Sequence, residues 1–111
     1  MVLKSFAKIN LTLRVNKKLN SGLHQIQSYF SQTNICDLIK IQKIKGQKDK
    51  IKFKDKFAKK INHNNSLIKT MNILREKKYV KDYYFISVDK RIPIFAGLGG
   101  GTSNSVCLTK Y

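Results

Sequence analysis

Acidic residues are scarce in this sequence. Six Asp and Glu, of which only one is Glu, stand against 23 Lys and Arg in 111 residues, for a formal net charge of +17. A charge of this size binds polyanions non-specifically. The lysines are scattered and Lys, Ile and Asn are abundant, so compositional drift is the simpler explanation and a selected nucleic-acid surface is the alternative. Only Arg14, Arg75 and Arg91 could make planar bidentate contacts, and no specific nucleic-acid partner is predicted.

Cysteine, histidine and long apolar runs are sparse as well. Cys36 and Cys107 are not spaced as zinc ligands, so we expect two reduced thiols in a cytosolic protein. His24 and His63 lie in no metal-binding pattern, and no metal ligand is predicted. No apolar run approaches the roughly 18 residues that a membrane helix needs, and the N-terminus alternates too regularly for a signal peptide. These absences favour the cytoplasm, or the equivalent organelle stroma, and no membrane partner.

Glycine is concentrated in one place. Four of the six glycines lie between residues 97 and 101, directly before Thr102, Ser103 and Asn104. These three residue types favour helix caps, and a helix start presents free N–H groups and the positive end of a dipole. A glycine loop that leads into such a helix is a natural phosphate cradle. The plain alternative is a mobile hairpin tip or linker.

Two familiar phosphate-binding loops are excluded by the residues around this run. A P-loop would need a Lys between Gly101 and Thr102. A dinucleotide fingerprint that starts at Gly97 reaches Thr102 at the position where helix–strand packing needs a small apolar residue. The apolar approach over 92–96, which includes Pro93, favours a loop held rigidly between two packed elements.

Residue periodicity predicts several strands, one helix and the start of a second. Apolar and polar residues alternate from 9 to 15, which is typical of a half-buried strand, with Lys8 and Asn10 on the opposite face. A polar turn over Asn16 to Gly22 leads into a second strand through Phe30. Further expected elements are a strand over 37–44, a Lys-rich excursion over 45–60 with a short strand over 51–53, a cap cluster over 62–66, a helix with Leu67, Ile68, Met71 and Leu74 in the core, and a strand over 85–89. This order predicts one α+β domain, a mostly antiparallel sheet with helices on one face.

The run from Pro93 to Asn104 resembles the P-x-x-x-G-L-G-[GS]-[GS]-S-[SA] ATP-binding loop of the small-molecule kinases named for galactokinase, homoserine kinase, mevalonate kinase and phosphomevalonate kinase. The triple glycine after Leu98 favours the branch of 4-diphosphocytidyl-2-C-methyl-D-erythritol kinases. Phe6–Val15 resembles the P-A-K-[IL]-N-L-x-L-x-[VI] opening of that branch, with Phe in place of the usual Pro. Asn20–Ser28 resembles its D-G-[YF]-H-x-[IL]-x-[ST] segment.

The resemblance implies roles for individual residues. Lys8 is then the catalytic residue at the phosphoryl-transfer centre, Asn10 lines the substrate pocket, and His24 binds the cytosine edge. Leu23 replaces the aromatic residue that stacks on the base, which removes stacking of roughly 1–3 kcal/mol. The residues expected to bind ATP are Pro93, Ile94, Phe95, Ala96, Gly97, Leu98, Gly99, Gly100, Gly101, Thr102 and Ser103, the last two through a phosphate oxygen or Mg²⁺.

The same resemblance implies a fold and a reaction. The fold is the ribosomal protein S5 domain 2-like N-terminal domain of these kinases, and the reaction is ATP-dependent phosphorylation of the 2-hydroxyl of 4-diphosphocytidyl-2-C-methyl-D-erythritol in non-mevalonate isoprenoid synthesis. Lys90 or Arg91 would neutralise nucleotide phosphates. The catalytic Asp of the family, in a G-A-D-[VI]-P segment, follows the part that this sequence resembles. We therefore expect residues 1–111 to form a single, truncated N-terminal ATP-binding domain that lacks the second domain and is inactive alone.

Two other functions stay open at this point. Leu23 leaves room for another small-molecule kinase of the same superfamily. The high positive charge, together with an S5-like topology that also occurs in RNA-handling proteins, leaves room for a small basic nucleic-acid-binding module. The sequence does not indicate an oligomeric state.

Overall fold

The protein contains a four-stranded sheet in a computed structural model that describes residues 1–55, 57–62 and 64–111. The strands lie in the order β1 (Val2–Lys18), β2 (His24–Ile44), β4 (Tyr83–Asp89) and β3 (Lys50–Lys54). β1 and β4 both pair antiparallel with β2, whereas β3 pairs parallel with β4. The mostly antiparallel sheet is confirmed, and β3 contains the short strand expected over 51–53.

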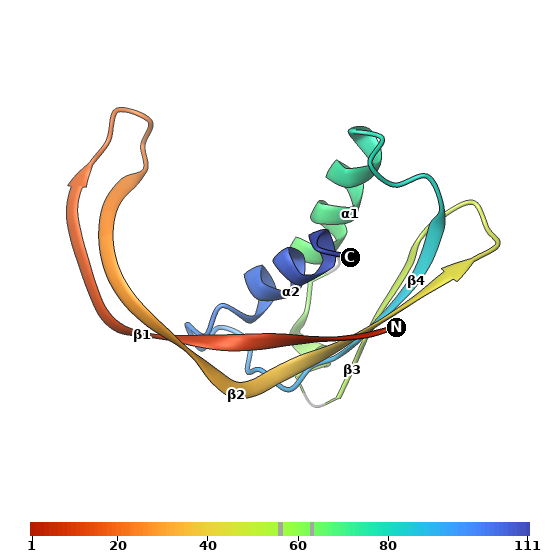
Figure 1. The fold of residues 1–111 in the computed structure, drawn as a ribbon, viewed down its shortest axis with the longest axis horizontal. Helices are drawn as coiled ribbons and strands as arrows, with labels where there is room; N and C mark the ends of the chain where they lie inside the picture. The colour runs from red at the N-terminus through yellow and green to blue at the C-terminus, as the bar shows by residue number, and fades with distance from the viewer. Residues whose placement is uncertain (56, 63) are drawn as a thin grey trace.

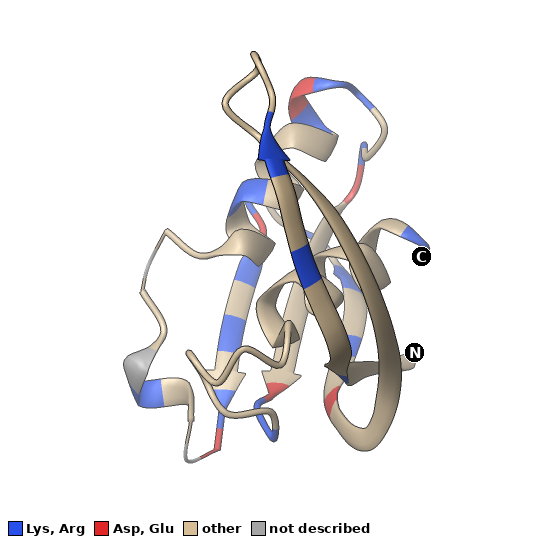
Figure 2. Cartoon of the chain, turned by 90° about the vertical axis from the view of Figure 1, so that its left-hand side faces the viewer, with Lys and Arg blue, Asp and Glu red and all other residues tan. Residues whose placement is uncertain are grey.

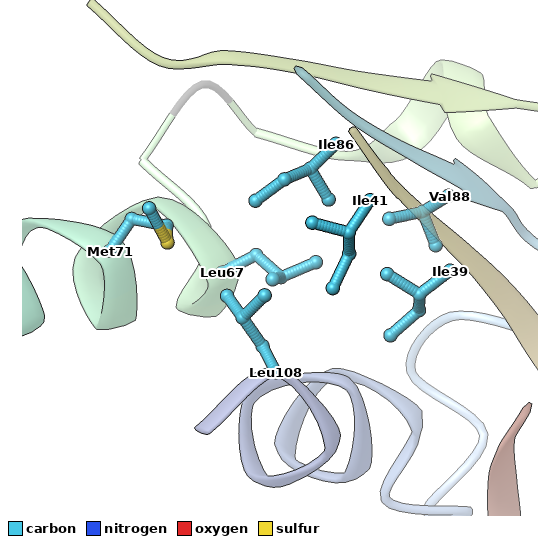
Figure 3. Packing of buried hydrophobic residues seen from close by; sticks show 7 residues of the cluster. All are labelled: Ile39, Ile41, Leu67, Met71, Ile86, Val88 and Leu108. Carbon is cyan, nitrogen blue, oxygen red and sulfur yellow. The ribbon is translucent and has the colours of Figure 1, made fainter. Parts of the chain in front are cut away.

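Two α-helices, α1 (Ser66–Glu76) and α2 (Gly100–Thr109), lie on the same side of this sheet (Figure 1), and the short 3₁₀ helix η1 covers Ala58–Lys60. Buried apolar side chains from β2, β4 and both helices meet between the two layers (Figure 3). They are Ile39, Ile41, Leu67, Met71, Ile86, Val88 and Leu108. Burial of a side chain of this kind contributes about 1.5–3 kcal/mol, so the core holds both helices on the sheet. The α+β class is confirmed.

The long hairpin of β1 and β2 differs from expectation in its burial. Its free end bends toward the side of the sheet on which the helices lie but stands apart from them (Figure 1), and the apolar residues expected to be half-buried are exposed there. Leu11, Leu13 and Val15 expose 67%, 56% and 57% of their surface. Alternation shows that one face of a strand is apolar, but it does not show that another element covers that face. The strand is therefore confirmed, and the prediction that it is half-buried is wrong.

The ends of these two strands also differ from the predicted ones. β1 continues to Lys18, so the turn is confined to residues 19–23, where the Leu19 N–H donates to the Leu23 carbonyl oxygen at 2.7 Å. Gly22 has the positive φ that its place in the turn suggested, +84°. β2 is one strand of 21 residues and joins the two strands that the sequence predicted separately.

Helix α1 begins within the predicted cap cluster. Asn65 is its N-cap, and the Asn65 side chain accepts hydrogen bonds from the backbone N–H groups of Leu67 and Ile68 at 3.1 and 3.2 Å. Such a cap contributes about 1 kcal/mol. His63, which belongs to the same cluster, lies outside the described residues.

The C-terminal turn of α1 is tied to the sheet by a largely buried ion pair. The Arg75 guanidinium donates to both carboxylate oxygens of Asp49, at 2.8 and 2.9 Å, and lies 4.3 Å from the Tyr83 ring centroid. Asp49 also accepts the Tyr84 N–H at 2.8 Å. This carboxylate therefore fixes α1 against the start of β4.

Lys and Arg are spread over β1, β2, β3 and α1 and are not gathered on one element (Figure 2). On β3, Lys50, Lys52 and Lys54 are exposed while the residues between them pack on the core. This distribution agrees with the scattered lysines of the sequence.

The core makes a prediction about stability. Leu67 is 1% exposed, so we expect Leu67→Ala to lower the free energy of unfolding by about 2–5 kcal/mol, because it leaves a cavity between α1 and the sheet. Leu13→Ala, on the exposed part of β1, should change it by less than about 0.5 kcal/mol. Urea denaturation followed by circular dichroism measures both values, and equal losses would contradict this placement of the core.

Candidate functional site

The glycine-rich loop connects β4 to α2. Gly97 and Gly99 have φ of +72° and +69°, and Gly99 is the N-cap of α2 in the left-handed region. The helix starts at Gly100, so Thr102, Ser103 and Asn104 lie inside it. The expectation that these residues cap the helix is wrong, because a glycine in a left-handed conformation takes that position.

The start of α2 presents unused hydrogen-bond donors. Among the residues that the structure describes, the backbone N–H groups of Gly100, Gly101 and Thr102 donate no hydrogen bond. The first N–H groups of a helix have no partner inside the helix, and they lie at the positive end of its dipole. This is the arrangement that binds an anion.

These donors border a cavity of about 460 Å³ between the loop and the first turn of α1. Asn65 and Ser66 line the side formed by α1, and the Ser66 hydroxyl donates to the Gly101 carbonyl oxygen at 3.0 Å. The loop side is lined by Pro93, Ile94, Phe95, Ala96, Gly97, Leu98, Gly99, Gly100, Gly101 and Thr102. The structure therefore brings together every residue expected to bind ATP except Ser103.

A second hollow, of about 370 Å³, lies on the β1 side of the loop. It is lined by Lys8 and Ser103, and it shares Gly99 and Thr102 with the first cavity. The Lys8 N–H donates to the Leu98 carbonyl oxygen at 3.0 Å, and a Cβ on Gly99 would lie 3.2–3.6 Å from the Lys8 side chain. Lys8 therefore packs directly against the loop.

Asn10 also lies at this point of β1. The Lys8 ammonium is 3.5 Å from the Asn10 side-chain oxygen and 5.6 Å from the Phe30 ring centroid. The β1–β2 register shifts between Phe6 and Lys8, where the loop meets β1. Such irregularities re-aim a side chain locally. The predicted pair Lys8 and Asn10 thus faces one place beside the glycine loop.

His24 is separated from these residues. It is exposed and pairs with Lys18 at the free end of the hairpin, beside the exposed Leu23. Gln32, the cross-strand partner of Lys8, is eight positions from His24 on β2, which is roughly 26 Å of extended chain. The structure does not place His24 at the glycine loop.

Asp37 is the residue of this region that the sequence did not single out. It is 0% exposed, and its side chain accepts hydrogen bonds from the Lys90 ammonium and from the backbone N–H groups of Arg91 and Ile92. The Arg91 guanidinium pairs with Asp89 instead. Both cations expected to neutralise phosphates therefore have carboxylate partners. The one sequence signal that could have identified Asp37 is an acidic residue in the apolar stretch over 37–44.

Asn104 completes this network from α2. It is 2% exposed, and its amide nitrogen donates to Asp37 at 2.9 Å. Its buried side-chain oxygen accepts no hydrogen bond from the described residues, although Asn104 lines the first cavity. A buried acceptor without a partner is costly.

Other kinds of site have little support in the described part of the chain. No group of three or more His, Cys, Asp and Glu there could hold a metal ion. None of the helices in that part is long and apolar enough to cross a membrane.

No protein-family profile matches the chain, but individual proteins do. It is 39% identical to the 4-diphosphocytidyl-2-C-methyl-D-erythritol kinase of Ureaplasma parvum, covering 100% of this chain and 43% of that kinase. The kinase of the same name from Pelagibacter ubique is 40% identical over 98% of this chain and 39% of its own length. The chloroplastic/chromoplastic kinase of Solanum lycopersicum is 34% identical over 95% of this chain and 26% of its own length.

A crystal structure of 4-(cytidine 5'-diphospho)-2C-methyl-D-erythritol kinase has the same fold in the matching part. It superimposes with a TM-score of 0.73 at 25% identity, over 98% of this chain and 39% of that structure. The chain thus spans about two-fifths of the length of the bacterial relatives named above.

The geometry of Gly99 yields a prediction. Gly99→Ala places a Cβ at positive φ and against the Lys8 side chain, so we expect the free energy of unfolding to fall by about 1–2 kcal/mol. Gly46→Ala is the matched control, since the nearest atom to an added Cβ there is the Ile44 Cδ1 at 3.9 Å. Thermal unfolding compares the two variants; a loss at Gly46 as large as at Gly99 would contradict a special role for the N-cap.

A second prediction concerns Cys107, which lines the hollow beside Lys8. Burial raises the pKa of the Cys107 thiol above its usual value, and Lys110 opposes this shift. A raised pKa means less thiolate at pH 8, so iodoacetamide should alkylate Cys107 more slowly in the folded protein than in urea. Mass spectrometry of digested samples over a pH series measures the rate, with Cys107→Ser to assign the peptide. A folded-state rate as fast as the unfolded-state rate would disprove the shift.

Proposed function

We propose that the chain forms the ATP-binding domain of a 4-diphosphocytidyl-2-C-methyl-D-erythritol kinase. The chain is similar over its whole length to the N-terminal part of such enzymes. The reaction is phosphorylation of the 2-hydroxyl of 4-diphosphocytidyl-2-C-methyl-D-erythritol. The single observation that carries the proposal is the row of unused N–H groups at residues 100–102, beside Lys8. The proposed fold is that of the ribosomal protein S5 domain 2-like N-terminal domain.

The first cavity suits a nucleotide in its chemistry. The amides of Gly100, Gly101 and Thr102, at the positive end of α2, would hold phosphate oxygens. A volume of about 460 Å³ lies within the range of small-molecule sites. The cavity therefore combines hydrogen-bond donors for phosphate oxygens with the volume of a small-molecule site.

Phosphoryl transfer needs charge compensation and alignment of the attacking hydroxyl. Lys8 lies on the other side of Gly99 from the nucleotide cavity, where its ammonium would stabilise the negative charge on the moving phosphoryl group. Asn10, whose side-chain oxygen is 3.5 Å from the Lys8 ammonium, would bind the substrate beside it. The hydroxyl groups of Thr102 and Ser103 would contact a phosphate oxygen or Mg²⁺. Mg²⁺ would neutralise the negative charge of the phosphates.

The proposed role of His24 is to bind the cytosine at the far end of an elongated substrate. The hairpin is curved (Figure 1), so the straight distance from His24 to Lys8 is shorter than the length of strand between them. Leu23 provides an apolar contact without the stacking of an aromatic ring. This assignment predicts weaker contacts with the base than in relatives that carry an aromatic residue there.

The described residues do not supply every group that the reaction needs. No described Asp or Glu lines either hollow, and the attacking hydroxyl needs a base or an orienting carboxylate. We therefore propose that residues 1–111 alone bind ATP and do not phosphorylate the substrate. Phosphorylation of the purified substrate by the isolated chain would contradict this part of the proposal.

Nucleotide binding provides the direct test. We expect the isolated chain to bind ATP with Mg²⁺ in calorimetry and Gly100→Val to lose this binding, because a Cβ there would lie 2.9 Å from the Ile92 side chain. Gly46→Val should keep the wild-type affinity, since the nearest atom to a Cβ at Gly46 is 3.9 Å away. Equal affinity in both variants would refute the loop as the site.

The same binding measurement also distinguishes a nucleotide site from the alternative function, a basic nucleic-acid-binding module. A basic binding module should bind single-stranded RNA with a steep dependence on salt and show no preference for ATP. A nucleotide site should keep its selectivity for ATP over other nucleotides as salt increases, because directional hydrogen bonds depend less on salt than non-specific phosphate contacts do.

A further inference from the structure

The segment from Pro93 to Gly99 is held in place mainly from its two ends. The hydrogen bonds that the described residues make with it are the Lys8 N–H to the Leu98 carbonyl and the Ser103 N–H to the Gly99 carbonyl. Phe95, at φ of +60° and 92% exposed, has an unfavourable backbone conformation without compensating burial. Strain of this kind persists only where the surroundings over-determine the conformation.

Both ends of this segment are attached to Asp37. Immediately before it, the N–H groups of Arg91 and Ile92 donate to one Asp37 carboxylate oxygen, each at 2.8 Å. Beyond it, the Asn104 amide donates to the other oxygen at 2.9 Å. One fully buried carboxylate on β2 therefore sets the distance between the end of β4 and the start of α2.

The same attachment sets the position of the first turn of α2. The fully buried Ile92 and the Lys90 ammonium, which pairs with Asp37, lie 2.9 and 3.3 Å from the place of a Cβ on Gly100. The free amides of the proposed phosphate cradle belong to this turn. A shift of Asp37 would move the cradle through Ile92, Lys90 and Asn104 together.

We infer that Asp37 is a positioning residue for the phosphate cradle. The inference deepens the proposed ATP-binding function and rests on it for the identity of the ligand, but it makes a claim about the unliganded loop as well. Asp37 acts through the N–H groups of Arg91 and Ile92 and through Asn104, and it does not line the cavity. Replacing one of the two carboxylate oxygens of Asp37 should loosen the glycine-rich loop while the protein stays folded.

The test variant is Asp37→Asn, in which an N–H₂ group faces two other donors, Lys90 and Asn104. We expect hydrogen exchange of the backbone amides over 97–104 to be faster and the affinity for ATP to be weaker, each by roughly tenfold or more. Amides at the free end of the β1–β2 hairpin, over 10–30, should exchange at the wild-type rate. Measurement well below the unfolding temperature separates this local effect from lost stability.

The matched control is Asp49→Asn, which breaks the comparable pair with Arg75 away from the loop. This variant should unfold at a lower temperature while its loop exchange and ATP affinity stay at the wild-type values. If Asp49→Asn loosened the loop as much as Asp37→Asn, the effect would be one of general stability and the inference would be overturned.

Two further outcomes are decisive. If Asp37→Asn does not fold, Asp37→Ala combined with Lys90→Met replaces it, because that variant leaves no unpaired buried ion yet still releases both ends of the segment. Wild-type loop exchange in the folded variant would overturn the inference. If the wild-type chain binds no ATP, the ATP proposal fails, and the exchange data still decide the role of Asp37.

Discussion

A buried carboxylate holds the functional end of this protein together. Asp37 has no exposed surface, and transfer of its charge out of water costs several kcal/mol unless hydrogen-bond donors replace the water. Lys90, the amides of Arg91 and Ile92, and Asn104 are those donors. Because they come from the end of β4 and from α2, satisfying one charge fixes two elements on the sheet. The glycine-rich loop is the chain between these attachment points.

Most other charged residues, and many apolar ones, lie on the surface and not in the buried network around Asp37. The lysines of β3 and most residues of β1 and β2 face solvent. The exposed lysines raise the net charge and do not stabilise the fold. Leu11, Leu13 and Val15 on the β1–β2 hairpin are also exposed, since α1 and α2 cover only the other part of the sheet. The stability of the fold and the proposed phosphate cradle therefore both depend on the part of the sheet that α1 and α2 cover.

Local sequence patterns anticipated most elements, because their causes are local. The apolar spacing of Leu67 and Met71 predicts a helix face, Asn65 is a typical cap, and Gly22 suits a turn with positive φ. The expectations that were wrong concerned the surroundings of a residue. A strand with alternating polarity does not reveal whether a helix covers it, and three good capping residues do not reveal that Gly99 already caps α2.

By itself, the sequence determined which stretches favour strands and helices and that the glycine cluster leads into a helix, since these features depend on backbone conformation and neighbouring residues. Only the tertiary structure decided that Lys8 lies against Gly99 and that Asp37, not a phosphate, neutralises Lys90. The physical reason is separation along the chain. Lys90 lies 53 positions from Asp37, and no local pattern encodes a contact between residues so far apart.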